Sequence, residues 1–385
     1  MLRFLDAGES HGAGMLAIVE GMPMGVPVSR EFLQAELARR RLGYGRGPRM
    51  TLEKDEVEIL GGVRGGRTLG SPVAVLVRNA EYQKWIKVMS PYGEVEAQPL
   101  TRPRPGHADL AGALKYGTKD IRDILERSSA RETVGRVCAG ALAKSLLACF
   151  DIHVHSHVLQ VGEARVTAAG VAPRREDVAA ADEDPMRCLD REASLRMREE
   201  VERARREGDS LGGVFEVVAY GIPPGLGSHV HWDRRLDGRL AAAVMSIQGI
   251  KGVEIGEGFL LAGMRGSRAS DPIHHSRRRG FYRRTNRAGG LEGGITNGEP
   301  VVVRAAMKPI PTLASPLETV DLVTKERVPA AVERADVCAV PAAAVIAESA
   351  VAFVLADSLL EKLGGDSLEE LEGRFRDLKR RYKAF

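Results

Sequence analysis

A glycine-rich segment that occurs twice constrains the fold of this chain more than any other feature. Residues 61–75 read GGVRGGRTLGSPVAV and residues 289–303 read GGLEGGITNGEPVVV, so glycines, a threonine and a proline recur at the same spacing. Each copy reads as a tight hairpin entering an apolar strand, and each follows a helix-like stretch, at 30–42 and 236–247. We predict an internal duplication; the alternative is that glycine hairpins resemble one another by composition.

Apolar periodicity predicts strands and long helices that do not alternate strictly. Stretches rich in small residues, at 130–149 and 342–363, are typical of helices that pack centrally. Strands are expected at 2–6, 15–20, 151–162, 214–221 and 300–306. This order favours an α+β layered fold over a doubly wound parallel sheet.

The chain reads as one domain over residues 1–385, because no Pro/Ser-rich linker divides it. Residues 173–209 carry many charges and few large apolar side chains, which predicts a solvated helical insertion. Residues 367–385 are also highly charged and predict a C-terminal helix.

Composition excludes several classes of protein. Lysine and arginine number 56 against 52 acids, too small an excess for a general nucleic-acid binder. The four cysteines stand far apart, which fits reduced thiols rather than a disulfide framework. We find no signal-like segment and no uninterrupted apolar stretch of membrane length, so we expect a cytoplasmic protein with no membrane partner.

The alternation of His153, His155 and His157 superficially resembles a metal site, but no catalytic metal is predicted.

Two loops present a histidine among small neighbours. His11 follows the first predicted strand in the segment GESHG, where it is a candidate general acid; a structural histidine is the alternative. His107 lies in the segment RPGHAD, close to Asp109. A carboxylate there favours the charged imidazole and orients the ring.

Arginines gather in three further segments. Residues 39–49 hold five arginines and no acid, so a bound polyanion is the natural means of offsetting their repulsion. Residues 127–133, RSSARET, predict a helix start whose N–H groups, hydroxyls and arginines suit a phosphate. Residues 265–287 hold eight arginines and one acid, which predicts a mobile loop that closes over an anionic ligand; a solvated loop is the alternative.

Together these segments resemble the chorismate synthase family, in order and over nearly the whole chain. The motifs are GESHG, GYGRGPRM, RPGHAD, RSSARET, GGLEGGITNG, KPIPT and RADVC. The resemblance implies the last step of the shikimate pathway, in which 5-enolpyruvylshikimate 3-phosphate loses phosphate and a C6 proton by anti 1,4-elimination to give chorismate. It also implies reduced FMN as cofactor, NADPH only as a possible reductant of that FMN, and a homotetramer. The implied subunit is a three-layer β-α-β sandwich with central helices between antiparallel sheets.

The resemblance further implies a role for each matching residue. His11 would be the acid toward the leaving phosphate, His107 would act on the reduced flavin, and Asp336 would relay the C6 proton through the flavin N5. The substrate would be bound by Ser10, Arg40, Arg46, Arg49 and Arg131. The FMN would be contacted by Arg127, Ser128, Ser129, Gln248, Gly249, Gly293, Lys308, Pro309, Ile310, Pro311, Thr312 and Arg334.

Two other classes of function stay open from the sequence. An NADPH-dependent flavin reductase would share the FMN site, and some members of the family carry out both reactions. A basic RNA-binding module would use the same arginine loops, although a content of 5% aromatic residues without an interleaved stacking pattern argues against it.

Overall fold

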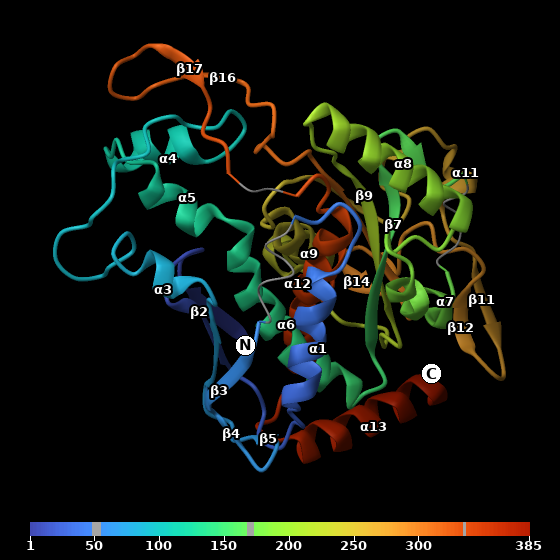
Figure 1. Cartoon of the computed structure of the whole chain (residues 1–385). Helices are drawn as coiled ribbons and strands as arrows, with labels where there is room; N and C mark the ends of the chain where they lie inside the picture. The colour runs from blue at the N-terminus through green and yellow to red at the C-terminus, as the bar shows by residue number, and fades with distance from the viewer. Residues whose placement is uncertain (48–54, 168–172, 334–335) are drawn as a thin grey trace.

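Two antiparallel sheets frame the computed structural model, which describes residues 1–47, 55–167, 173–333 and 336–385 (Figure 1). The first sheet has the order β1-β2-β6-β3, with strands β1 (Arg3–Ala7), β2 (Gly14–Glu20), β3 (Val57–Gly61) and β6 (Val73–Arg78). The second has the order β10-β15-β9-β7-β8, with strands β7 (His153–Val161), β8 (Ala164–Arg165), β9 (Gly213–Tyr220), β10 (Ile250–Ile255) and β15 (Val301–Met307). All five predicted strands lie within two residues of their expected bounds.

Helices fill the space between the sheets (Figure 1). They are α1 (Arg30–Arg41), α6 (Thr133–Ala148), α9 (Leu236–Met245) and α12 (Val340–Leu363). Helix α6 packs on β1 and β2, α12 packs on β7 and β9, and the two helices pack on each other. They lie in close contact at Gly140, where an added Cβ would lie 2.2 Å from the Cβ of Ser349. The small residues that predicted central helices therefore permit close packing of the two backbones.

Helix α12 is buried on nearly every side. By length and composition it is apolar enough to cross a bilayer, yet 72% of its most apolar 18-residue window is buried within the protein. A helix that is apolar all round and buried in this way belongs to a protein core.

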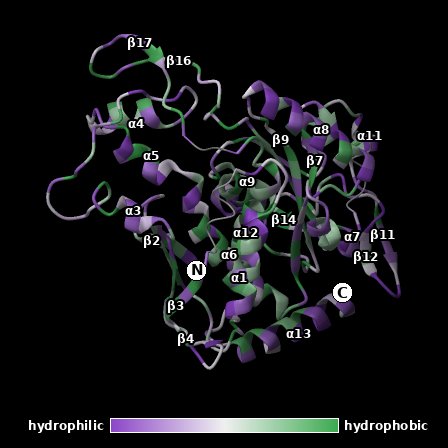
Figure 2. Ribbon diagram, viewed as in Figure 1, coloured by the Kyte–Doolittle hydropathy of each residue, from purple (hydrophilic) through white to green (hydrophobic). Residues whose placement is uncertain are grey.

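The two charged segments form helices on the periphery. Residues 173–209 contain α7 (Arg175–Ala179), the 3₁₀ turn η2 (Ala180–Glu183) and α8 (Arg191–Glu207). Figure 2 shows mainly hydrophilic residues on α8, whose inner face buries Met197 and Val201. Helix α13 (Leu368–Ala384) begins at the cap Ser367 and buries Leu371, Phe375 and Leu378. Both are amphipathic helices that cover the core.

The two copies of the glycine-rich segment fold alike. The first forms β4 (Val63–Arg64) and β5 (Arg67–Thr68), and the second forms β13 (Leu291–Glu292) and β14 (Ile295–Thr296). The Thr68 hydroxyl accepts from the Val26 N–H at 2.9 Å, and the Thr296 hydroxyl accepts from the Leu226 N–H at 2.8 Å. Each hydroxyl donates to a proline carbonyl, that of Pro23 or Pro223. The strand orders β1-β2-β6-β3 and β7-β9-β15-β10 correspond as well.

Residues 265–287, predicted as a mobile loop that closes over an anionic ligand, contain regular structure. The segment forms α11 (Gly266–Ala269) and a hairpin of β11 (Ile273–Ser276) with β12 (Gly280–Arg283). Ring contacts across the two strands stabilise the hairpin; the ring centroids of His275 and Phe281, for example, lie 5.0 Å apart. The prediction rested on the many arginines of the segment and did not consider these contacts. Asp271 also accepts from the backbone N–H groups of Arg287 and Ala288.

The remaining short elements lie outside the two main sheets. They are α3 (Tyr82–Trp85), α4 (Asp109–Tyr116), α5 (Arg122–Ser128), the 3₁₀ turns η1 (Ala130–Glu132) and η3 (Trp232–Arg234), α10 (Gly258–Leu261), β16 (Glu318–Val320) and β17 (Arg327–Pro329). Figure 1 shows the hairpin of β16 and β17 above α4.

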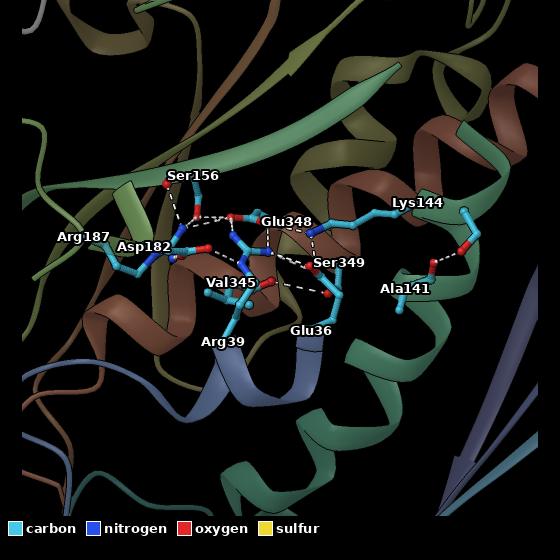
Figure 3. Close-up of polar contacts among 11 residues, drawn as sticks. Glu36, Arg39, Ala141, Lys144, Ser156, Asp182, Arg187, Val345, Glu348 and Ser349 are labelled. Atoms are coloured by element: carbon cyan, nitrogen blue, oxygen red, sulfur yellow. Dashed lines mark hydrogen bonds and ion pairs between the residues drawn. The ribbon is translucent and has the colours of Figure 1, made fainter. Parts of the chain in front are cut away.

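A buried cluster of charges joins the central helices (Figure 3). At its centre lies Glu348 of α12, whose side chain is fully buried. Glu348 accepts hydrogen bonds from Arg39 of α1, Lys144 of α6, Arg187 of the insertion and Ser156 of β7. Glu36 and Asp182 complete the cluster, so that three cations face three carboxylates. Burial would raise the pKa of Glu348, but the charges of Arg39 and Lys144 hold it well below its usual value.

Candidate active site

A cavity of about 580 Å³ opens where the N-terminal ends of α6 and α12 meet one end of the second sheet. Its described lining comes from the loop after β1, the end of α1 and the loop that follows, residues 104–108, residues 125–133, residues 247–251, residues 307–312 and the segment that leads into α12. Small-molecule sites commonly have this size and lie at such junctions. The fold therefore brings distant segments of the sequence to one cavity.

His11 lies in the wall of the cavity with its ring held on two sides. Its Nδ1 lies 2.9 Å from one carboxylate oxygen of Glu126, whose side chain is only 2% exposed. Its ring also stacks on the Trp85 indole, with 4.0 Å between ring centroids. Burial would raise the pKa of Glu126, but the hydrogen bond and charge of His11 lower it below its usual value. The carboxylate is therefore an anion beside the imidazole.

His107 has a similar arrangement. Its Nδ1 lies 2.5 Å from the Asp109 carboxylate, which also accepts from the Arg104 guanidinium at 2.8 Å. Arg104 in turn donates to the Thr312 hydroxyl at 3.0 Å. Burial opposes ionisation of Asp109, but His107 and Arg104 hold its pKa well below the usual value. The sequence prediction that Asp109 orients this ring agrees with these contacts.

Arg40 and Arg131 share a buried carboxylate. Both guanidinium groups bond Asp55, and Arg40 also donates to the Thr133 hydroxyl at 3.3 Å. The Nε of Arg40 is buried and has no hydrogen-bond partner in the structure. Burial lowers the pKa of Arg40 to about 10, although the Asp55 charge opposes the shift. A buried cation with an unused donor is suited to bind an anion in the cavity.

Arg46 and Asp336 form an ion pair at the same cavity. One carboxylate oxygen accepts from the Arg46 guanidinium at 2.5 Å, and the other accepts from the Gly47 backbone N–H at 2.6 Å. The pair joins the loop after α1 to the segment before α12. A group held in this way is positioned in the absence of any ligand.

An amide and two lysines also line the cavity. Gln248 donates from its Nε2 to Glu132 at 2.7 Å, whereas its buried Oε1 has no hydrogen-bond partner among the described residues. Lys308 donates to the Gly106 carbonyl, and Lys251 is a further lining residue. Burial lowers the pKa of Lys308, and the nearby charge of Lys251 adds to the shift.

Comparison with known proteins identifies the family. The family profile described as chorismate synthase matches residues 2–360. A chorismate synthase of Carboxydothermus hydrogenoformans is 54% identical over 98% of each chain, and one of Salinispora tropica is 58% identical over 96% of each. A solved structure, described as a crystal structure of chorismate synthase, has a TM-score of 0.82, 43% identity, and covers 100% of this chain and 99% of its own.

The chain belongs to the chorismate synthase family. The resemblance predicted from the motifs is confirmed, and with it the assignment to the last step of the shikimate pathway. The protein is accordingly an enzyme of the lyase kind.

Most residues that the chorismate synthase motifs predicted for the site line this one cavity. They are Ser10, His11, Arg40, Arg46, His107, Ser128, Ser129, Arg131, Gln248, Gly249, Lys308, Pro309, Ile310, Pro311, Thr312 and Asp336. Their separate roles stay predictions.

Four predicted residues are not among the described lining of the cavity. The Arg127 guanidinium turns to Asp6, at 2.6 Å, rather than into the cavity. Gly293 lies in the turn between β13 and β14. Arg49 and Arg334 fall outside the described residues, so their assignment to this chorismate synthase site stays a prediction.

Several residues at the site were not found from the sequence. They are Asp55, Trp85, Arg104, Glu126 and Thr133. Arg104 stands inside the RPRPGHAD segment and could have been chosen from its place there. Within the described ranges, no group of three or more His, Cys, Asp or Glu is placed to hold a metal ion. His157 instead pairs with Glu216 at 3.2 Å.

Proposed function

We propose that this protein converts 5-enolpyruvylshikimate 3-phosphate to chorismate by anti 1,4-elimination of phosphate, with reduced FMN bound beside the substrate. The observation that carries the proposal is the cavity itself. It combines two imidazoles, each paired with a buried carboxylate, with the guanidinium groups of Arg40, Arg46 and Arg131. Proton donors beside fixed cations are what loss of a phosphate leaving group requires.

The arginines would bind the three anionic groups of the substrate. Arg40 and Arg131 are fixed by Asp55, so little side-chain freedom is lost when a ligand arrives. The unused Nε of Arg40 supplies a charge-assisted hydrogen bond for a phosphate or carboxylate oxygen. Preorganised cations of this kind stabilise the negative charge that develops on a departing phosphate.

A second set of lining residues fits FMN. The unpaired Oε1 of Gln248 can accept from a ring N–H, and Lys251 and Lys308 supply positive charge for a phosphate. Ser128, Ser129 and residues 308–312 add hydroxyl and backbone groups. When bound, reduced FMN supplies electron density to the allylic system as the C–O bond breaks.

Three side chains would handle protons. His11 gives a proton to the leaving phosphate, and Glu126 stabilises the imidazolium from which the proton comes. His107 holds a proton beside the flavin through its pair with Asp109. Asp336 takes up the C6 proton, which requires that its ion pair with Arg46 loosen as the carboxyl group becomes neutral. The FMN requirement, the roles of these residues and the possible use of NADPH all belong to the proposal.

We also infer a three-layer β-α-β sandwich that arose by internal duplication. The matching strand orders and the matching contacts of Thr68 and Thr296 support this inference. The family resemblance supports a homotetramer that acts in the cytoplasm on a small molecule, without a nucleic-acid or membrane partner.

An anaerobic assay tests the proposed reaction. Enzyme, 5-enolpyruvylshikimate 3-phosphate and chemically reduced FMN are mixed, and chorismate and phosphate are followed together with oxidised FMN as the control. Equal release of both products with reduced FMN alone supports the proposal. Folded protein that binds FMN and releases neither product would overturn it. Steady NADPH oxidation without the shikimate ester would instead support a flavin reductase.

A further inference from the structure

The Trp85 indole lies flat against the imidazole of His11. The ring planes are inclined by 26° and their centroids are 4.0 Å apart. Trp85 ends the short helix α3, whereas His11 lies in the loop after β1, so the contact joins two separate segments. An aromatic surface at this distance restricts rotation of the imidazole and shields one of its faces from water.

Glu126 holds both the ring and the backbone of His11. The Nδ1 of the ring lies 2.9 and 3.1 Å from the two carboxylate oxygens, and the His11 backbone N–H donates to the second oxygen at 2.8 Å. The ring nitrogen that Glu126 does not engage is Nε2. A carboxylate on Nδ1 therefore fixes the tautomer and the orientation of the ring.

Arg122 connects the two supports. Its guanidinium lies 5.2 Å from the centre of the Trp85 ring and donates to Glu126 at 3.4 Å. It thus lies on the aromatic surface as a cation and also neutralises part of the buried carboxylate charge. Trp85, Glu126 and Arg122 all come from outside the motifs that identify the family.

We propose that Glu126 and Trp85 are positioning residues for His11. Glu126 fixes Nδ1 and Trp85 fixes the plane of the ring, so that the imidazole is held in one orientation at the cavity wall. This inference rests on the proposed function, in which His11 is the proton donor, and adds how that donor is held. Small errors in the position of a proton donor slow a reaction without weakening substrate binding.

Tryptophan fluorescence gives a test that does not depend on turnover. The chain has two tryptophans, and the exposed Trp232 on η3 can be replaced by phenylalanine. In this W232F background, the emission of Trp85 is measured at one pH without flavin, because the emission of an indole depends on the group stacked on its ring. We expect the emission to change in His11→Gln, where the stacked imidazole is gone, and also in Glu126→Gln, where the imidazole loses the carboxylate that holds it.

Kinetics supply the second measurement. We expect Glu126→Gln to lower kcat about 10- to 100-fold while KM changes less than about 3-fold, because orientation of the proton donor is lost and the binding groups remain. Trp85→Ala should act in the same direction, and Trp85→Phe should restore most of kcat because it keeps an aromatic surface.

Glu216→Gln is the matched control. Glu216 is as buried as Glu126, and it also pairs with a histidine and an arginine, His157 and Arg304. It lies on the second sheet away from the cavity lining, so its loss should leave both the Trp85 emission and kcat unchanged.

The outcomes separate this inference from the proposed function. Chorismate formation with wild-type Trp85 emission and wild-type kcat in Glu126→Gln overturns the inference alone. If the emission of Trp85 does not change when His11 is replaced, the stacking contact is overturned. The expected fluorescence changes in a protein that forms no chorismate support the arrangement around His11 and overturn the assigned reaction.

Discussion

The Arg39 guanidinium and the Glu348 carboxylate meet through two hydrogen bonds, of 2.8 and 2.9 Å, at the centre of the molecule. The pair joins α1 to α12, and Arg39 immediately precedes Arg40, which lines the cavity. Arg39 of the buried ion cluster is thus the sequence neighbour of Arg40, which is one of the arginines assigned to the substrate. The cluster fixes the end of α1 from which Arg40 projects.

Replacing Glu348 by glutamine should destabilise the protein strongly. The variant leaves the positive charges of Arg39, Lys144 and Arg187 buried without the carboxylate that neutralises them. Removing one partner of a buried ion pair lowers the free energy of unfolding by about 3–5 kcal/mol. Urea unfolding measures the loss. The exposed pair of Arg3 and Glu20 is the control, because Glu20→Gln should cost less than about 1 kcal/mol. Equal losses in the two variants would contradict the predicted role of the cluster.

Replacing Arg40 by lysine should weaken substrate binding. The planar guanidinium of Arg40 can bond Asp55, Thr133 and an anion at the same time. A lysine keeps the positive charge, but its ammonium group cannot make all of these contacts together. We expect KM for 5-enolpyruvylshikimate 3-phosphate to rise about 10- to 100-fold, the loss of one or two charge-assisted hydrogen bonds. Steady-state kinetics measure this KM. Arg30→Lys, at the other end of the same helix, should leave KM unchanged; a normal KM in Arg40→Lys would remove that residue from the binding site.

His155 should make the protein less stable in mild acid. Burial lowers the pKa of His155 to about 4, whereas an unfolded histidine has a pKa of about 6.5. Between these values the unfolded chain binds a proton that the folded chain does not, so the free energy of unfolding falls as pH drops from about 6.5 to 4. Allowing for partial exposure, we expect a loss of about 1–2 kcal/mol. Denaturant unfolding at about pH 7.5 and 5 should show a smaller loss in His155→Gln, and equal losses would refute the prediction.

Replacing Gly140 by alanine should force α6 and α12 apart. The added Cβ would meet the Cβ of Ser349 and its Cα, at 2.2 and 2.5 Å, so neither helix can keep its position. Overpacking of this kind costs about 1–3 kcal/mol. Gly266→Ala provides the control, because an added Cβ there has open space. Thermal unfolding compares the two, and a Gly140→Ala protein as stable as the wild type would show that the helices are not packed so closely.

The sequence predicted the elements whose pattern is local. Helix α12 and strands β2 and β9 carry their own apolar signal, so their bounds were found within two residues. The cavity loops around His11 and His107 were found because glycine and proline mark turns within a few residues.

The contacts between distant segments could not be predicted in this way. Glu126 lies 115 residues from His11, and Asp55 lies 76 residues from Arg131, so neither pairing leaves a periodic trace in the sequence. The hairpin at 273–283 was missed for a related reason, since its stabilising ring contacts form only when the two strands pair. Local pattern thus predicted which loops carry the chemistry, and the tertiary fold decides what supports them.

The interlocking of α6 with α12 has a consequence for how the chain is made. Helix α6 covers the first sheet, and its other face is buried largely against α12, which follows much later in the sequence. A nascent chain therefore exposes apolar surface of α6 until residues 340–363 have left the ribosome. We expect the two sheets to pack together in one cooperative step only after that point, and the chain to be prone to aggregation until then.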